Sequence, residues 1–239
     1  MLADYHVHTA FSNDSTYPME EVVKRAITLG LDEICFSDHT DYGMGDNQIC
    51  NFPAYFQEIR RLKALYQDQI AIKAGAEFGM QVHTVHDYEQ AFAAYPFDFV
   101  ILSCHQIDNQ EFWNQEFQRG KTQEEVNRRY YEEIYEVMKR YTNYSVLGHL
   151  DAIKRDDPWG IYPFEKNKHI IEQILRLTIE QGKGIEVNTS NFRYHLPDLT
   201  PCRDILRLYY EMGGHLITLG SDSHCEEHLA AHFPYVIEE

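Results

Sequence analysis

The sequence predicts an α/β protein that folds as one barrel-like domain of seven β/α units. Short apolar runs alternate with longer stretches in which apolar residues recur every three or four positions. Several runs are β-branched and too apolar to face water on either side, which is typical of parallel strands covered by helices. The 239 residues contain no Pro/Gly/Ser-rich linker or internal repeat, and they suit a barrel close in size to the eight-stranded kind. An open doubly wound sheet is the alternative, although no G-x-G-x-x-G follows the first strand.

The apolar runs place seven strands, and the helical patterns place five helices between them. Each helical pattern has apolar residues at three- and four-residue spacing, and the first one begins with Pro18 and ends before Gly30. The expected strands are residues 2–7, 33–37, 70–76, 97–103, 144–148, 184–188 and 215–219. The expected helices are residues 18–29, 53–67, 122–141, 165–181 and 201–212.

Composition and charge narrow the class of protein. With 44% hydrophobic and 25% charged residues, the chain is globular and not disordered or fibrous. Lys and Arg number 21 against 38 Asp and Glu, and the net charge of −17 disfavours nucleic acid and anionic membranes as partners. Five cysteines without a C-x-x-C pair, no signal segment and no spanning apolar run predict a soluble cytoplasmic protein with reduced thiols.

Ionisable side chains stand at the carboxyl ends of the expected strands. His6 and His8 lie two residues apart on an extended chain, so their rings project to the same face and can converge on one ion. The other strands end in S-D-H, G-A-E, S-C-H, G-H-L-D, E-V-N and S-D-S-H. All seven strands therefore finish on a potential metal ligand.

A single histidine at a strand end is more often a hydrogen-bonded loop residue than a ligand, but seven such ends are harder to explain. Burying so many ionisable groups at one rim costs several kcal/mol per unpaired group unless cations or hydrogen bonds compensate them. A multinuclear site of Zn, Mn or Fe fits imidazole and carboxylate ligands, and no clustered cysteine set suggests a closed structural zinc. The remaining histidines are interpreted as structural or solvated, with His195 as the exception.

In their order, the motifs H-x-H, S-D-H, G-x-E, S-x-H, G-H-x-D and S-D-S-H resemble the polymerase and histidinol phosphatase (PHP) superfamily. The resemblance covers the whole chain and implies a single domain over residues 1–239, a distorted (β/α)7 TIM-like barrel with a trinuclear metal centre at its C-terminal rim. The stretch S-C-H-Q-I-D, the following G-K-T-Q-E-E, and N-T-S with Arg193 are similar to the monofunctional L-histidinol phosphate phosphatases of histidine biosynthesis.

The resemblance also implies a ligand set of nine residues for two to three divalent ions. One ion would take His6, His8, Glu77 and Asp222; a second would share Glu77 and take His105 and His149; a third would take Asp14, His39 and His224. Asp14 departs from relatives that place a histidine six residues after the H-x-H motif. Its hard oxygen is expected to make the third site more tolerant of Mn or Fe.

For the substrate, a small phosphate monoester, the resemblance suggests that Arg155 and Arg193 bind the phosphate, since guanidinium forks suit phosphate oxygens. Ordinary salt bridges are the alternative for both. Asp108 and Glu111, with Trp113 nearby, could receive the cationic imidazole and amine, or could form a solvated acidic loop.

The expected mechanism uses a hydroxide that bridges the first two metals as the nucleophile, with Glu77 and Asp222 holding those metals. His195 or a metal-bound water is the candidate general acid. Three alternatives remain: a PHP phosphoesterase for nucleotides or oligonucleotide ends, a non-catalytic metal-binding module, and a metal-dependent amidohydrolase. The sequence leaves the oligomeric state open.

Overall fold

The fold is a nearly closed barrel of seven parallel strands, seen in a computed structural model that describes residues 1–45 and 48–237. Neighbouring strands follow one another along the chain, so no crossover reverses the order as in a doubly wound sheet. The strands are β1 (Ala3–Val7), β2 (Glu33–Phe36), β4 (Ala71–Gly79), β5 (Phe99–Ser103), β8 (Val146–Leu147), β9 (Gly184–Asn188) and β10 (Ile217–Gly220).

The barrel closes where the segment after β10 meets β1. The amide of His8 donates to the carbonyl oxygen of Ser223 at 2.8 Å, and the amide of Ser223 donates to the carbonyl oxygen of His6 at 3.3 Å. Val7 and Ser223 form a parallel bridge. The predicted barrel of seven β/α units is therefore confirmed, and the open-sheet alternative is wrong.

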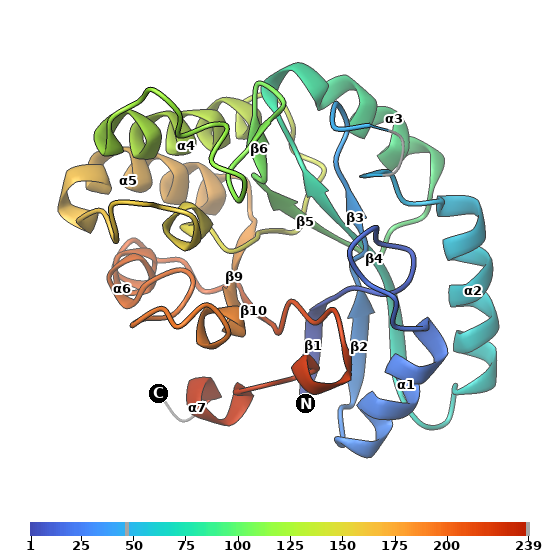
Figure 1. Ribbon diagram of the computed structural model, residues 1–239. Coiled ribbons are helices and arrows are strands. Elements are labelled where there is room, and N and C mark those ends of the chain that lie inside the picture. The colour runs from blue at the N-terminus through green and yellow to red at the C-terminus, as the bar shows by residue number, and fades with distance from the viewer. Residues whose placement is uncertain (46–47, 238–239) are drawn as a thin grey trace.

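Helices surround the strands on the outside (Figure 1). They bury one face against the barrel, as α1 does with Met19, Val22, Val23 and Ala26. All five expected helices form, and none of the described helices could cross a membrane. The α-helices are α1 (Met19–Thr28), α2 (Phe52–Leu65), α3 (Val85–Ala94), α4 (Gln123–Met138), α5 (Phe164–Glu180), α6 (Arg203–Glu211) and α7 (Phe233–Ile237). The 3₁₀ helices η2 (Val82–Thr84), η3 (Ala152–Arg155), η4 (Thr189–Phe192) and η5 (Glu226–His228) also occur.

Several short elements were not expected from the sequence. Helix α3 buries only Val85, Tyr88 and Ala91, and this short pattern lies in a polar stretch. Strand β3 (His39–Thr40) pairs with β4 and has only two residues. Strands β6 (Gln106–Ile107) and β7 (Gln110–Glu111) form a hairpin whose two turn residues, Asp108 and Asn109, have positive φ angles of 54° and 58°. Asp and Asn tolerate that conformation, which hairpin turns of two residues require.

Two buried tyrosines hold the carboxyl ends of the central strands in place. The hydroxyl of Tyr55 lies 3.0 and 2.8 Å from the carbonyl oxygens of Phe36 and Gly75, at β2 and β4. The hydroxyl of Tyr88 lies 2.8 and 2.9 Å from the carbonyl oxygens of Thr40 and Gly79. Since a buried carbonyl without a partner is costly, these contacts make the rim of the barrel a firm base for side chains that point inward.

Candidate metal centre

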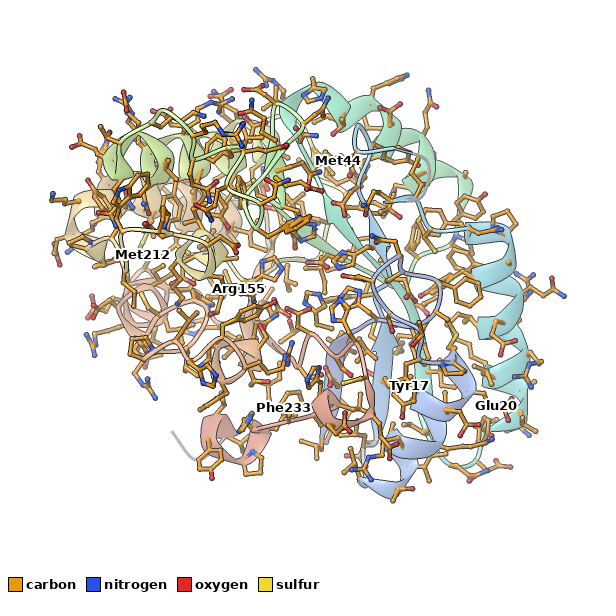
Figure 2. The ribbon with its side chains drawn as sticks, viewed as in Figure 1. Tyr17, Glu20, Met44, Arg155, Met212 and Phe233 are labelled. Carbon is orange, nitrogen blue, oxygen red and sulfur yellow. The ribbon has the colours of Figure 1, made fainter. Side chains whose placement is uncertain are left out.

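The carboxyl ends of the strands surround a cavity of about 550 Å³. Its wall carries His39 and His105 beside β4 and β5, His149 and Arg155 after β8, and His224 after β10. Figure 2 places Arg155 near the middle of the molecule, inside the ring of helices, whereas Glu20 and Met212 lie farther out. The strand ends therefore meet at one site, as the sequence predicted for a barrel of parallel strands.

Glu77 is fully buried among four imidazole rings, three of which belong to residues that line this cavity. Its Oε1 is 2.8 Å from His149 Nε2 and 3.1 Å from His105 Nε2. Its Oε2 is 3.1 Å from His6 Nε2 and 3.0 Å from His39 Nδ1. Burial alone would raise the pKa of Glu77, but the charges of the surrounding histidines hold it well below its usual range. The carboxylate is thus placed to serve two ions at once.

Asp222 completes a group with His6, His8 and Glu77 that we call the inner site. Its Oδ1 lies 3.8 Å from His6 Nε2 and 3.5 Å from His8 Nε2, and its Oδ2 lies 3.4 Å from Arg155 Nη2. The backbone of Asp222 has a positive φ of 56°, a left-handed conformation that Asp tolerates better than most residues other than glycine. This conformation brings the carboxylate close to the imidazoles of His6 and His8.

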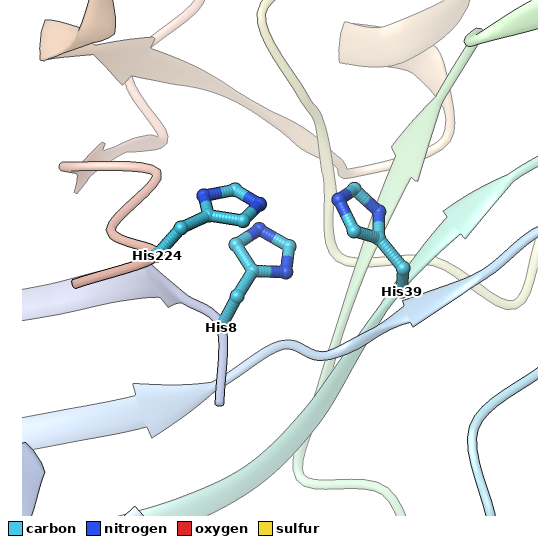
Figure 3. A group of neighbouring side chains, drawn as sticks. All are labelled: His8, His39 and His224. Carbon is cyan, nitrogen blue, oxygen red and sulfur yellow. The ribbon is translucent and has the colours of Figure 1, made fainter. Parts of the chain in front are cut away.

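Glu77 with His105 and His149 forms what we call the middle site, and Asp14 with His39 and His224 forms the outer site. Asp14 Oδ2 is 3.1 Å from His224 Nε2 and 3.5 Å from His39 Nε2. Figure 3 shows the rings of His39 and His224 beside that of His8, and each of the two ring centroids lies 4.1 Å from that of His8. His8 therefore stands between the inner and outer sites.

The donor atoms fit divalent metal ions. His6 Nε2, His8 Nε2, His39 Nδ1 and Glu77 Oε2 are buried and have no hydrogen-bond partner among the described residues. Four overlapping groups of three residues from these sites hold their ligand atoms within 4.8 Å of one another. Unpartnered buried donors are costly, and cations would compensate them. Imidazole with carboxylate suits Zn, Mn or Fe.

Both predicted arginines reach the cavity wall. Arg155 Nη2 donates to Ser190 Oγ at 2.6 Å, and its guanidinium lies 4.8 Å from the ring centroid of Tyr194. Its Nε is buried and lacks a hydrogen-bond partner among the described residues. Arg193 donates through Nη1 to the carbonyl oxygen of Ser221 at 2.8 Å and through Nη2 to that of Asp222 at 2.7 Å. Both arginines are therefore anchored beside the inner site.

Two predicted site residues lie elsewhere. Asp108 is 73% exposed in the β6–β7 turn, 3.8 Å from Arg129, and His195 is exposed after η4. Neither is among the described residues that line the cavity, whereas Glu111 and the exposed Trp113 are. Alternation along a strand could not place Asp108 or His195, because both occupy turns with positive φ.

Asp41 and His228 are ionisable residues of the cavity wall that the sequence interpretation missed. Asp41 Oδ1 lies 2.9 Å from His105 Nδ1, and its spacing from His39 on an extended segment was an available signal. His228 was interpreted as structural or solvated, but it lines the cavity from η5. No local pattern marks it, because η5 meets the site only through the closure of the barrel.

Comparison with known proteins gives consistent matches. A family model described as PHP domain matches residues 4–190. The chain is 39% identical over 225 residues to the histidinol-phosphatase of Lactococcus lactis subsp. lactis (strain IL1403), which covers 92% of this chain and 83% of that protein. It is 27% identical to a probable histidinol-phosphatase of Thermotoga maritima, over 100% of this chain and 91% of that protein.

Solved structures agree with the fold. The crystal structure of histidinol phosphate phosphatase from Lactococcus lactis, complexed with Zn, L-histidinol and phosphate, matches with a TM-score of 0.84 and 36% identity, covering 94% of this chain and 87% of that one. The structure of a putative histidinol phosphatase from Listeria monocytogenes has the same TM-score at 20% identity, over 98% and 99% of the two chains, and supports the fold alone.

Proposed function

The chain belongs to the PHP domain family, and from that premise we propose that it is a histidinol-phosphatase of histidine biosynthesis that hydrolyses L-histidinol phosphate to L-histidinol and phosphate. One observation carries the proposal. A buried cluster of imidazoles and carboxylates shares a cavity of about 550 Å³ with two anchored arginines. The similarity to the Lactococcus lactis enzyme, whose structure holds Zn, L-histidinol and phosphate, supports the same substrate here.

The inner, middle and outer sites would hold two to three divalent ions of Zn, Mn or Fe, with Glu77 shared between the inner and middle sites. The distances from Glu77 to rings on both of its sides support this division. Bound in this way, paired divalent ions would supply a hydroxide nucleophile at neutral pH and would neutralise charge on a phosphoryl group. Glu77 and Asp222 would fix the positions of the bound ions, because both carboxylates are buried and are held by several partners.

Arg155 and Arg193 would bind the substrate's phosphate from the side of the inner site. The buried, unpartnered Nε of Arg155 supports an acceptor next to it. Arg193 uses two donors on the backbone of Ser221 and Asp222, so it would hold that segment in place as well as bind the phosphate. Guanidinium groups fixed in advance need no reorganisation when charge builds on the phosphoryl oxygens.

Glu111 and Trp113 would receive the imidazole and amine of the substrate. Both line the cavity, and Glu111 Oε2 accepts a hydrogen bond from Asn114 Nδ2 at 2.7 Å, which keeps the carboxylate in place. A carboxylate beside an exposed indole suits a cationic heterocycle. The positions of Asp108 and His195 give no support to substrate binding by the first or proton donation by the second.

The test is a comparison of kcat/KM for L-histidinol phosphate, a nucleoside monophosphate, an aryl phosphate and a short oligonucleotide. The proposed function expects L-histidinol phosphate to be hydrolysed best, and expects substrates without the imidazole and amine to lose kcat as well as affinity, because remote binding positions the phosphate. Preference for the nucleotide or the oligonucleotide would contradict the assignment of substrate.

A further inference from the structure

Two imidazoles around Glu77 have a carboxylate against their outer nitrogen. His6 Nδ1 lies 2.5 Å from Glu186 Oε1, and His105 Nδ1 lies 2.9 Å from Asp41 Oδ1. On the opposite side of each ring, Nε2 lies 3.1 Å from an oxygen of Glu77. One ring belongs to the inner site and the other to the middle site.

The other imidazoles of the centre differ in what faces Nδ1. The Nδ1 of His8 lies 3.2 Å from Ser12 Oγ, and the Nδ1 of His149 is buried without a hydrogen-bond partner among the described residues. The Nδ1 of His224 lies 2.9 Å from the carbonyl oxygen of Asp222 and 3.7 Å from Asp222 Oδ1. The Nδ1 of His39 lies 3.0 Å from Glu77 Oε2, with Asp41 Oδ2 farther away at 3.9 Å. Among the described residues, a close carboxylate from outside the predicted ligand set therefore supports one ring in each of the two sites that share Glu77, and none in the outer site.

Both carboxylates are themselves fixed. Glu186 Oε2 accepts from the amide of His149 at 2.7 Å and from Asn188 Nδ2 at 3.3 Å. Asp41 is 7% exposed, and its Oδ1 accepts a hydrogen bond from Gln106 Nε2 at 3.5 Å. Neither carboxylate is free to leave its imidazole without breaking contacts of its own.

Two glycines provide the space for these pairs. A methyl group at position 79 would collide with Asp41 Oδ1 and lie 2.5 Å from His105 Nδ1. A methyl group at position 220 would collide with Glu186 Oε1 and lie 2.5 Å from the Cβ of His6. Neither glycine has a positive φ, so space for the neighbouring side chains, and not backbone conformation, is the reason for a glycine here.

We propose that Asp41 and Glu186 are positioning residues that hold His105 and His6 with Nε2 directed at the Glu77 sites, and that Gly79 and Gly220 form the niches that admit them. An acceptor at Nδ1 fixes the proton on that nitrogen and leaves the lone pair of Nε2 for a metal ion. This inference rests on the proposed metal centre, but it concerns how ions are retained and not which phosphate ester is hydrolysed.

The test measures metal affinity by chelator competition with Zn²⁺, together with the number of ions retained after gel filtration. Asp41→Ala and Glu186→Ala should each weaken the binding of one ion by about ten- to a hundred-fold, the usual effect of losing an outer partner of a ligand. Asp41→Asn and Glu186→Gln keep an oxygen acceptor and should recover part of that loss. Wild-type affinity in both alanine variants would overturn the proposal.

The niche variant Gly79→Ala gives a test that leaves Asp41 and His105 in the chain. It should also weaken metal binding by about ten-fold or more, and the added loss should be smaller when Asp41→Ala is already present, because contacting residues are not additive. Equal losses in both backgrounds would show that the glycine does not serve the Asp41 pair.

Glu33→Gln is the matched control. Glu33 is a buried carboxylate at the start of β2, close to Tyr5 Oη and 3.4 Å from Lys73 Nζ, at the opposite end of the barrel. It should lower stability without changing metal affinity, and thermal unfolding of the metal-free proteins separates the two effects. If all variants bind Zn²⁺ as expected and wild type does not hydrolyse L-histidinol phosphate, the proposed function fails and the positioning roles stand.

Discussion

The inner and outer sites use the same types of side chain in opposite surroundings. In the inner site His6, His8 and Glu77 have no exposed surface. In the outer site Asp14 is 46% exposed and His224 is 24% exposed. Ionisable groups without water depend on cations or hydrogen bonds, whereas exposed ones are solvated. The difference indicates that the inner site would depend on a bound cation for its own stability more than the outer site would.

The elements that carry the ligands differ less than the burial does. His6 lies within β1, and Glu77 lies within β4, which pairs with both β2 and β5. In the outer site His39 lies in the short strand β3, and Asp14 lies in the loop before α1. Asp222 of the inner site and His224 of the outer site share the segment between β10 and η5. Because ligands on strands are held more accurately than ligands on loops, Asp14 is expected to be the ligand held least firmly, and burial remains the main difference between the two sites.

The largest effect in this comparison is expected from Glu77→Gln. Glu77 touches rings of all three sites, so losing its charge should cost about 4 kcal/mol or more, about a thousand-fold in kcat/KM. His224→Asn, which removes one ligand of the outer site, should cost clearly less. Steady-state kinetics and elemental analysis of both variants check this order, and equal losses would mean that the sites are not ranked by burial.

The next effect concerns the arginines next to the inner site. Arg155→Ala and Arg193→Ala should each cost about 2–4 kcal/mol, or about thirty- to a thousand-fold in kcat/KM, by removing charge-assisted contacts to the phosphate. Arg155→Lys keeps the charge but loses the planar fork, and it should recover only part of the activity. Metal content serves as the control and should stay at the wild-type value. An unchanged kcat/KM would assign the arginines to ordinary salt bridges.

Partial removal of metal should separate the sites directly. On dialysis against a weak chelator, one ion per chain should leave first, and it should come from the outer site because solvent reaches Asp14 and His224. In His224→Asn this first ion should already be missing, which the ratio of metal to protein measures. If the ion of the inner site left before the ion of the outer site in both proteins, the comparison would be reversed.

The sequence predicted the seven strands and brought eight of the nine candidate ligands to one rim, because in a parallel barrel every strand end is a place where side chains converge. The ninth candidate, Asp14, was implied only by the resemblance to the PHP superfamily. The sequence did not place Asp41, since β3 has only two residues and gains its position by pairing with β4, which left the two-residue spacing of Asp41 from His39 as the one local signal. It named Glu186 at the end of β9 without assigning its contact with His6, which joins residues 180 positions apart. The local sequence pattern shows at which end of a strand an ionisable side chain lies. Its contact partners depend on packing across the barrel, which the local pattern does not show.

The smallest effect is expected from Asp14→His at the outer site. The carboxylate of Asp14 supplies the hard oxygen of this group, and a third imidazole beside His39 and His224 would give a nitrogen-only set that favours zinc over manganese. Because the position is half-exposed, the larger ring can be accommodated, and kcat/KM for a zinc-loaded enzyme should change by only about a few-fold. Loading with equimolar Zn²⁺ and Mn²⁺ followed by elemental analysis should show a higher zinc fraction than wild type, with the inner and middle sites unaffected. The same metal composition in both proteins would show that Asp14 is not a ligand, and the outer site would then have to draw on His8, whose ring already lies 4.1 Å from those of His39 and His224.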